Sequence, residues 1–126
     1  MDRNEWKPVI REYLKRYPAC SFAHISELEG AEGDRVHCLN KDENIVLWIN
    51  LNGEFINALV EMEKEEEIVL TPVLDTLGML LLGGSLNMPL IKLDLIAKYK
   101  KHKTEHWLPV IIDLTEKGKS LISSQV

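Results

Sequence analysis

Apolar side chains recur at helical spacing near the start of the chain. Residues 4–17 place them three or four positions apart with charged residues between, the pattern of an amphipathic helix. Pro8 falls in the first turn, where its missing N–H is tolerated, and Pro18 ends the helix. The inward-facing residues are expected to be Trp6, Val9, Ile10, Tyr13, Leu14 and Tyr17.

A second, shorter helix is predicted within residues 21–30. Ser21 would cap its start, and Gly30 would stop it. The residues expected to face inward are Phe22, Ile25 and Leu28. The sequence "AEGD" at 31–34 then predicts a loop.

The period next changes from helical to extended. Residues 35–39 ("RVHCL") and 45–49 ("IVLWI") are rich in β-branched and apolar side chains, and the polar residues 40–44 between them are typical of a turn. This pattern predicts a β-hairpin.

A helix over residues 53–66 follows the hairpin. Asn52 is a good N-cap, and Glu54 in the first turn suits the helix dipole. Its buried stripe is expected to be Phe55, Ile56, Leu59, Val60 and Met62. The residues outside that stripe are mainly acidic, and Glu54, Glu61 and Glu65, followed by Glu66 and Glu67, are expected to face outward.

The rest of the chain predicts further strands and a terminal helix. A strand over 68–73 is followed by turns and short apolar segments within 74–93, a polar and basic connector over 93–107, and a strand over 108–114. Thr115 would cap a helix over residues 115–124.

The order of these elements resembles the winged-helix family, in which a recognition helix leads directly into the first strand of the wing. The segment "LTEKG" also resembles the residues that follow the wing in multiple-antibiotic-resistance-type repressors. Leu114, Thr115, Glu116, Lys117 and Gly118 match that segment. The resemblance implies a winged-helix-like topology. It does not extend to a basic wing with arginine, because the preceding residues are "HWLPVIID", and the hairpin separates the second helix from the third.

Charge argues against sequence-specific DNA reading by the third helix. The formal net charge of the chain is −5, and a helix that presents glutamates to phosphates is repelled by them. An acidic helix face instead suits a solvated surface or contact with a basic protein. The concentrated positive charge lies in "KYKKHK", where lysines could contact phosphates and a tyrosine could stack on a base. These candidate nucleic-acid-binding residues are Lys92, Lys98, Tyr99, Lys100, Lys101 and Lys103.

The cysteines and histidines give no metal motif. His37 and Cys38 are adjacent in a predicted strand, so their side chains would point to opposite faces, and the histidines at 102 and 106 lack the glutamate of the zinc-protease pattern. Cys20 and Cys38 are expected to be structural thiols without metal.

Together these features predict one α+β domain over residues 1–126, winged-helix-like, with three or four helices and a small antiparallel sheet. We expect a non-enzymatic cytoplasmic module, regulatory or accessory, that acts through a protein partner or as a homodimer, with no cofactor, metal or membrane contact. Its candidate protein-interaction residues are Glu54, Glu61 and Glu65. The alternative is a DNA-binding regulator that contacts phosphates weakly and without sequence preference through the lysine segment. A third is a small enzyme whose site the sequence does not display.

Overall fold

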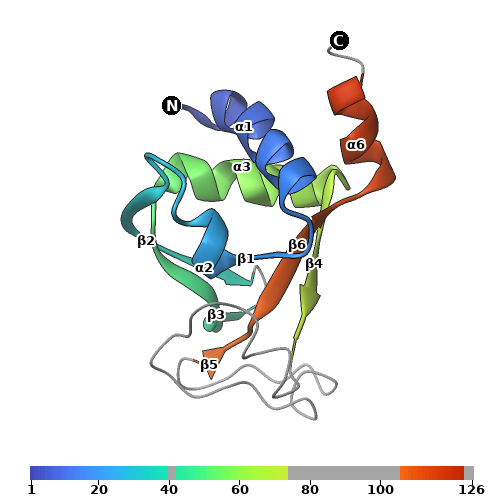
Figure 1. Cartoon of the computed structure of the whole chain (residues 1–126). Coiled ribbons are helices and arrows are strands. Elements are labelled where there is room, and N and C mark those ends of the chain that lie inside the picture. Colours follow the sequence, from blue (N-terminus) through green and yellow to red (C-terminus); the bar gives the residue numbers. More distant parts are fainter. Residues whose placement is uncertain (40–41, 74–105, 124–126) are drawn as a thin grey trace.

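The computed structural model describes residues 1–39, 42–73 and 106–123 of the chain (Figure 1). This part of the protein is α+β and contains four helices, in agreement with the predicted class. The helices are α1 (Arg3–Arg16), α2 (Phe22–Ile25), α3 (Gly53–Lys64) and α6 (Glu116–Ser123). In Figure 1, α1 and α3 lie side by side, and α6 stands beside α1.

One sheet joins the beginning, middle and end of the described chain. Its strand order is β1–β6–β4, so that β6 (Val110–Leu114) pairs antiparallel with both β1 (Cys20–Ser21) and β4 (Ile68–Pro72). Side chains of β6 alternate between fully and partly buried, as expected for a strand that is covered on one face. The strand predicted after the third helix is confirmed as β4, and it pairs with β6, the last strand.

The second sheet is mixed, whereas the sequence predicted a small antiparallel one. It contains the predicted hairpin, β2 (Glu32–Leu39) and β3 (Asp42–Leu51), in antiparallel pairing. A short strand, β5 (His106–Trp107), adds to β3 in parallel. The hairpin and β5 lie in a sheet of their own, with the order β2–β3–β5.

The core lies where α1 and α3 meet. Trp6 and Phe55 pack edge to face with ring centroids 4.9 Å apart, and both are almost completely buried. The predicted stripes are largely confirmed, since Ile10, Leu14 and Leu59 are also buried. Tyr17, which was predicted to face inward, is 52% exposed because α1 ends one residue earlier, and its ring contacts that of Tyr13 in a tilted arrangement.

The starts of the helices are fixed partly by capping side chains. Asp2 and Glu5 form a capping box at the start of α1, and Asn52 caps α3 as predicted, because its Oδ1 accepts from two backbone N–H groups. Ser21 occupies the N-cap position of α2 without making a cap hydrogen bond. Its Oγ instead lies 3.1 Å from Nδ1 of His24.

Several local predictions are wrong. Helix α2 ends at Ile25, well before the predicted stop at Gly30, and residues 42–44 of the predicted turn belong to β3. Residues 32–34 belong to β2 and are not a loop, because the hairpin extends past the apolar run to pair Glu32 with Leu51. The end of the predicted basic connector, residues 106–107, is strand β5. The turns and strands predicted within 74–93, and most of the 93–107 connector, lie outside the described residues.

The position of Leu59 gives a direct test of the face that α3 buries. Leu59 is 1% exposed, so Leu59→Ala should lower the free energy of unfolding by about 2–5 kcal/mol. Asn57→Ala, on the exposed side of the same helix, should change it by less than about 0.5 kcal/mol. Urea denaturation of both variants measures this difference, and equal values for the two would place the wrong face in the core.

Candidate functional site

The acidic side of α3 lies against the first half of α1. Nζ of Lys7 is 2.8 Å from Oε1 of Glu61, and Nε of Arg3 is 3.3 Å from Oε2 of the same carboxylate. The hydrogen bond from Lys7 lowers the pKa of Glu61 below its usual value. Oε2 of Glu54 accepts from the backbone N–H of Arg3 at 2.9 Å. Glu65 is the most loosely held of these carboxylates, 4.0 Å from Lys7.

The three glutamates proposed for protein contact are therefore committed, in different degrees, to contacts within the chain. A helix that looks acidic in sequence is flanked by the basic residues of its neighbour. A partner that approached Glu61 would have to compete with Arg3 and Lys7, so the α1–α3 contact is a weaker candidate for an interaction surface than the sequence implied.

The C-terminus of α3 turns sharply into β4 through three consecutive glutamates. The Glu66 N–H donates to the carbonyl of Glu63, and the Glu67 N–H donates to that of Met62. Glu66 itself has φ of 63°. This is the Schellman arrangement, in which a left-handed residue closes the helix, here with glutamate in the position that usually holds glycine.

Glu67, which was predicted to face outward with its neighbours, is buried at 2% exposure. The Schellman turn directs its side chain inward, and Arg11 of α1 meets it there. Nε and Nη2 of Arg11 both lie near Oε1 of Glu67, at 2.8 and 2.7 Å. The charge of a buried carboxylate needs such a partner, because transfer from water without one is costly.

The "LTEKG" segment forms hydrogen bonds with the same turn. The N–H of Thr115 donates to the carbonyl of Glu67, and its Oγ1 donates to that of Glu66. Oγ1 also accepts from the N–H of Gly118 at 3.1 Å, which confirms Thr115 as the cap of α6. Gly118 is required there, because a Cβ would overlap the carbonyl oxygen of Glu67.

A wide, open hollow lies between the two sheets, and we call it the intersheet hollow. Its volume is about 800 Å³. Leucine, isoleucine and valine side chains of both sheets form its wall, and charged residues from the end of α3 and the start of α6 form its rim. The apolar lining residues include Leu39, Leu47, Ile68, Val69, Leu70, Leu108 and Val110, and the charged ones are Glu63, Glu66, Glu116 and Lys117.

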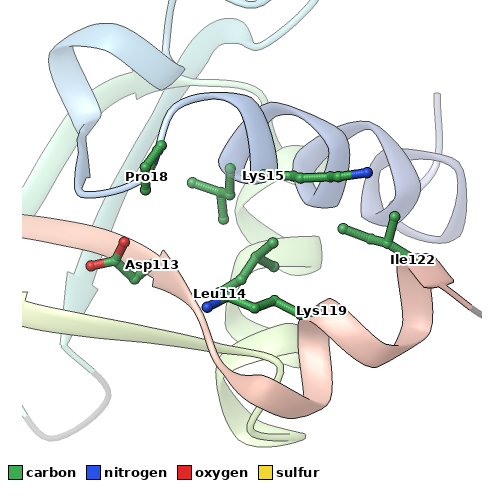
Figure 2. Close-up of a pocket in the computed structure, with 7 residues that line it drawn as sticks. Lys15, Pro18, Asp113, Leu114, Lys119 and Ile122 are labelled. Carbon is green, nitrogen blue, oxygen red and sulfur yellow. The ribbon is translucent and has the colours of Figure 1, made fainter.

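A second hollow, the α1–α6 pocket, has a volume of about 630 Å³ and is shown in Figure 2. Its apolar lining consists of Leu14, Pro18, Leu114 and Ile122, and its charged lining of Lys15, Asp113 and Lys119. In Figure 2, Pro18 and Asp113 lie at one end of the space, and Ile122 lies at the other. The two lysines come from the two facing helices.

Cys20 and Cys38 do not form a disulfide with each other. Burial raises the pKa of Cys20 to about 11 and that of its hydrogen-bonding neighbour Tyr13 to about 12. A thiol with so high a pKa is protonated and unreactive at neutral pH. Across the described ranges, no three or more histidine, cysteine, aspartate or glutamate side chains are placed to hold a metal ion.

The sequence pattern drew attention to His37 only as a possible metal ligand, and the structure shows that its side chain is buried. Its ring packs edge to face on Phe22, with centroids 5.6 Å apart, and is 6% exposed. Burial lowers its pKa from 6.5 to about 4. Its Nδ1 has no hydrogen-bond partner among the described residues, and neither do the indole N–H groups of Trp6 and Trp107.

The lysine candidates Lys92, Lys98, Tyr99, Lys100, Lys101 and Lys103 lie outside the described residues. The part of the chain that is described holds nine lysines and arginines against seventeen aspartates and glutamates, and is thus more acidic than the whole protein. Sequence reasoning missed both hollows and the Arg11–Glu67 pair. The signal that could have found the pair is an arginine on the edge of the first helix opposite a glutamate run.

Comparison of the chain with protein-family models, with curated proteins and with solved structures gives no match. Among the described helices, none is long and apolar enough to cross a membrane.

Removing one partner of the Arg11–Glu67 pair should be strongly destabilising. Arg11→Ala leaves a buried carboxylate without its cation and should lower the free energy of unfolding by about 3–5 kcal/mol. Replacing both charges, as in Arg11→Met with Glu67→Leu, should restore most of that loss. The matched control is Arg16→Ala, an exposed arginine on the same helix, with a change under about 0.5 kcal/mol. Additive effects of the two single changes in a double-mutant cycle would contradict the pairing.

Acidification should destabilise the fold through His37. The unfolded histidine takes up its proton near pH 6.5, while the folded one does so only near pH 4, so between these values the unfolded state binds more protons. The free energy of unfolding should therefore fall on acidification by about 1.4 kcal/mol per pH unit across this window. His37→Leu should remove that component, and His24→Leu, at an exposed position, should keep it. Parallel pH profiles for the wild type and His37→Leu in chemical denaturation would show that His37 is not buried in its neutral form.

Proposed function

We propose that the protein is a non-enzymatic, winged-helix-like interaction module that binds a basic, apolar segment of a partner protein in the intersheet hollow. The observation that carries the proposal is the combination of an apolar wall with an acidic rim in that hollow. The likeness to a winged helix is supported by the order of elements and by the antiparallel pairing of β4, which follows α3 directly, with β6.

The wall supplies the apolar part of such a contact. Leu70 is only partly buried, although it packs against the core, and Val69 on the same strand is 45% exposed. Apolar side chains that stay accessible in a concave surface favour binding of apolar groups, because their transfer from water is favourable. β4 is also an edge strand within the described part of its sheet, which suits an extended segment.

The rim supplies the charge preference. Among the described residues of the rim, three glutamates, Glu63, Glu66 and Glu116, stand against one lysine, Lys117. Nζ of Lys117 donates to the backbone carbonyl of Glu65, so that it is held at the turn. A second copy of the chain would bring an equally acidic rim against this one, whereas lysines or arginines of a different partner would be attracted to it. The acidic balance of the described chain favours a basic partner for the same reason.

Nucleic-acid binding is the other candidate that the sequence offers, and it depends on the lysines between 92 and 103. The described body gives it no support, since its seventeen aspartates and glutamates outnumber its nine lysines and arginines and would repel phosphates. It remains the alternative to a protein contact, and duplex DNA is therefore one arm of the test.

The proposal predicts a charge-selective peptide interaction. In fluorescence anisotropy, a labelled peptide that alternates leucine with lysine should bind, and its counterpart with glutamate in place of lysine should not. Leu70→Arg, which places a cation in the wall, should weaken binding of the lysine peptide about tenfold or more, the loss expected for an anchoring apolar contact. Val36→Arg, at an apolar residue that is 49% exposed and does not line the hollow, is the matched control.

Several outcomes would overturn the proposal. Equal binding of the two peptides would remove the charge preference, and an unchanged affinity in Leu70→Arg would remove the site. Tight binding to duplex DNA that is lost on changing Lys98, Lys100, Lys101 and Lys103 to alanine, measured by size-resolved mass with and without DNA, would replace it with the nucleic-acid alternative.

A further inference from the structure

We infer that the basic segment of the partner adds to β4 as an antiparallel strand, held by main-chain hydrogen bonds along the edge that faces away from β6. The inference rests on the proposed function and specifies how its ligand is bound. β4 lies at one end of the order β1–β6–β4 and runs beside β6 in Figure 1. Among the described residues, no strand pairs with its outer edge.

The hydrogen bonds between β4 and its neighbour show which main-chain groups the outer edge offers. The N–H of Thr115 donates to the carbonyl of Glu67, and the N–H of Val73 donates to that of Pro109. The register between these two bonds has no shift, and the main-chain groups of successive residues point to alternate sides of a strand. Those of the even-numbered residues therefore point away from β6. These residues are Ile68, Leu70 and Pro72.

The intersheet hollow reaches this outer edge. Val69 and Leu70 are adjacent in β4, and their side chains point to opposite faces of the sheet, yet both line the hollow. Contact with both residues indicates that the space extends around the edge that β6 leaves open. An added strand would therefore lie against the apolar wall of the hollow.

The edge of β2 suits strand addition less well. The pairing of β2 with β3 has register shifts at four places, and the first five residues of β2 are exposed and include Glu32, Asp34 and Arg35. Bulges and charges on an edge oppose pairing with a further strand. β1 and β5 have two residues each. β4 has an unbroken register and no charged side chain, so it is the described edge best suited to an added strand.

Pro72 limits the length of the added strand and argues against a second copy of this chain as the occupant. It has no N–H, so the donors of the outer edge are those of Ile68 and Leu70. In a pair of β4 strands centred on Leu70, each Pro72 would lie opposite Ile68 and could donate no hydrogen bond. Such a pair would also bring two acidic rims together. A segment of another protein, with lysines or arginines beside its leucines, meets neither obstacle.

Carboxylates at the start of β4 favour a cationic segment. Glu66 comes two residues before Ile68, and Glu116 comes two residues after Leu114, which pairs with Ile68. Partial loss of solvent raises the pKa of Glu63, and among the described residues its carboxylate has no hydrogen-bonding or ion-pair partner. A cation from the partner would stabilise that charge. A strand antiparallel to β4 brings its C-terminal end toward this group.

N-methylation of the peptide tests the main-chain contacts. In an antiparallel pair, residues opposite Ile68 and Leu70 share the face of those side chains, so the leucines of the leucine–lysine peptide would direct their N–H groups to β4. Methylation of a central leucine nitrogen should weaken binding about tenfold, the size of one lost hydrogen bond. Methylation of the adjacent lysine nitrogen is the matched control and should change the affinity little. Fluorescence anisotropy measures both.

Amide hydrogen exchange, followed by NMR on the full chain, tests the edge of the protein itself. In the free protein the N–H of Leu70 should exchange faster than those of Val69 and Thr71, which face β6. The leucine–lysine peptide should slow exchange at Leu70 about tenfold when roughly nine in ten chains are bound. The amide of Val36, on β2, should exchange at the same rate with and without peptide.

Equal effects of the two methylations, or a loss confined to the lysine position, would overturn the antiparallel strand. Slow exchange of the Leu70 amide in the free protein would also overturn it, because the edge would not be open. Protection of Leu70 that grows with protein concentration in the absence of peptide would assign the edge to a second copy of the chain. If the peptide keeps its charge preference in any of these cases, the proposed function stands and the binding mode alone fails. If no peptide binds, both fail.

Discussion

The ion pair between Arg11 and Glu67 is the contact on which the arrangement of the helices depends. It ties the middle of α1 to the residue that begins the path from α3 into β4. The backbone of that same residue receives the N–H of Thr115, and its carbonyl oxygen leaves no room for a side chain at Gly118. Three helices and the sheet thus meet at one turn. A buried ion pair at this point adds little net stability compared with an apolar pair. Any other placement of α1 would nevertheless cost much free energy, because Glu67 would then be buried without its cation.

The glutamate run at the end of α3 is tolerated because each member has a separate environment. Glu65 ends the helix, Glu66 adopts the left-handed conformation that reverses the chain, and Glu67 turns inward to Arg11. Glycine at 66 would close the helix with less strain, so the sequence keeps a charge at the rim of the intersheet hollow at some cost in stability. Farther back along the helix, Lys7 and Arg3 neutralise Glu61. Glutamates that would repel one another in an isolated helix therefore have different surroundings: one is paired with cations, one closes the helix end and one faces solvent.

Much of the secondary structure followed from local pattern. The helical spacing from Trp6 to Leu14, the Asn52 cap and the alternation in β6 are properties of short segments, and each is confirmed. What failed depends on neighbours distant in sequence. The outward direction assigned to Glu67 was wrong because no helical pattern reveals that an arginine 56 residues earlier lies beside it. Residues 32–34 and 106–107 became strands because β3 offers an edge on each side, which their own composition does not predict. The two hollows also could not be predicted from local pattern, because each is lined by residues of at least three elements that are distant in sequence.

α6 contributes side chains to both hollows, and its attachment to the α3–β4 turn determines which side chains line each of them. Glu116 and Lys117, in its first turn, belong to the rim of the intersheet hollow, while Lys119 and Ile122, one turn later, line the α1–α6 pocket. Lys117 and Lys119, two positions apart, point to different sides of the helix, and Glu116 lies 3.6 Å from Lys119 at the boundary, so a single helix lines both hollows. Each side chain of α6 faces its own hollow only while the helix keeps the same orientation about its long axis. Thr115 and Gly118 fix this rotation against the α3–β4 turn, and a change at Gly118 would alter both surfaces at once. Leu70 and Lys15, by contrast, lie on β4 and α1, and changes there reach one surface without the other.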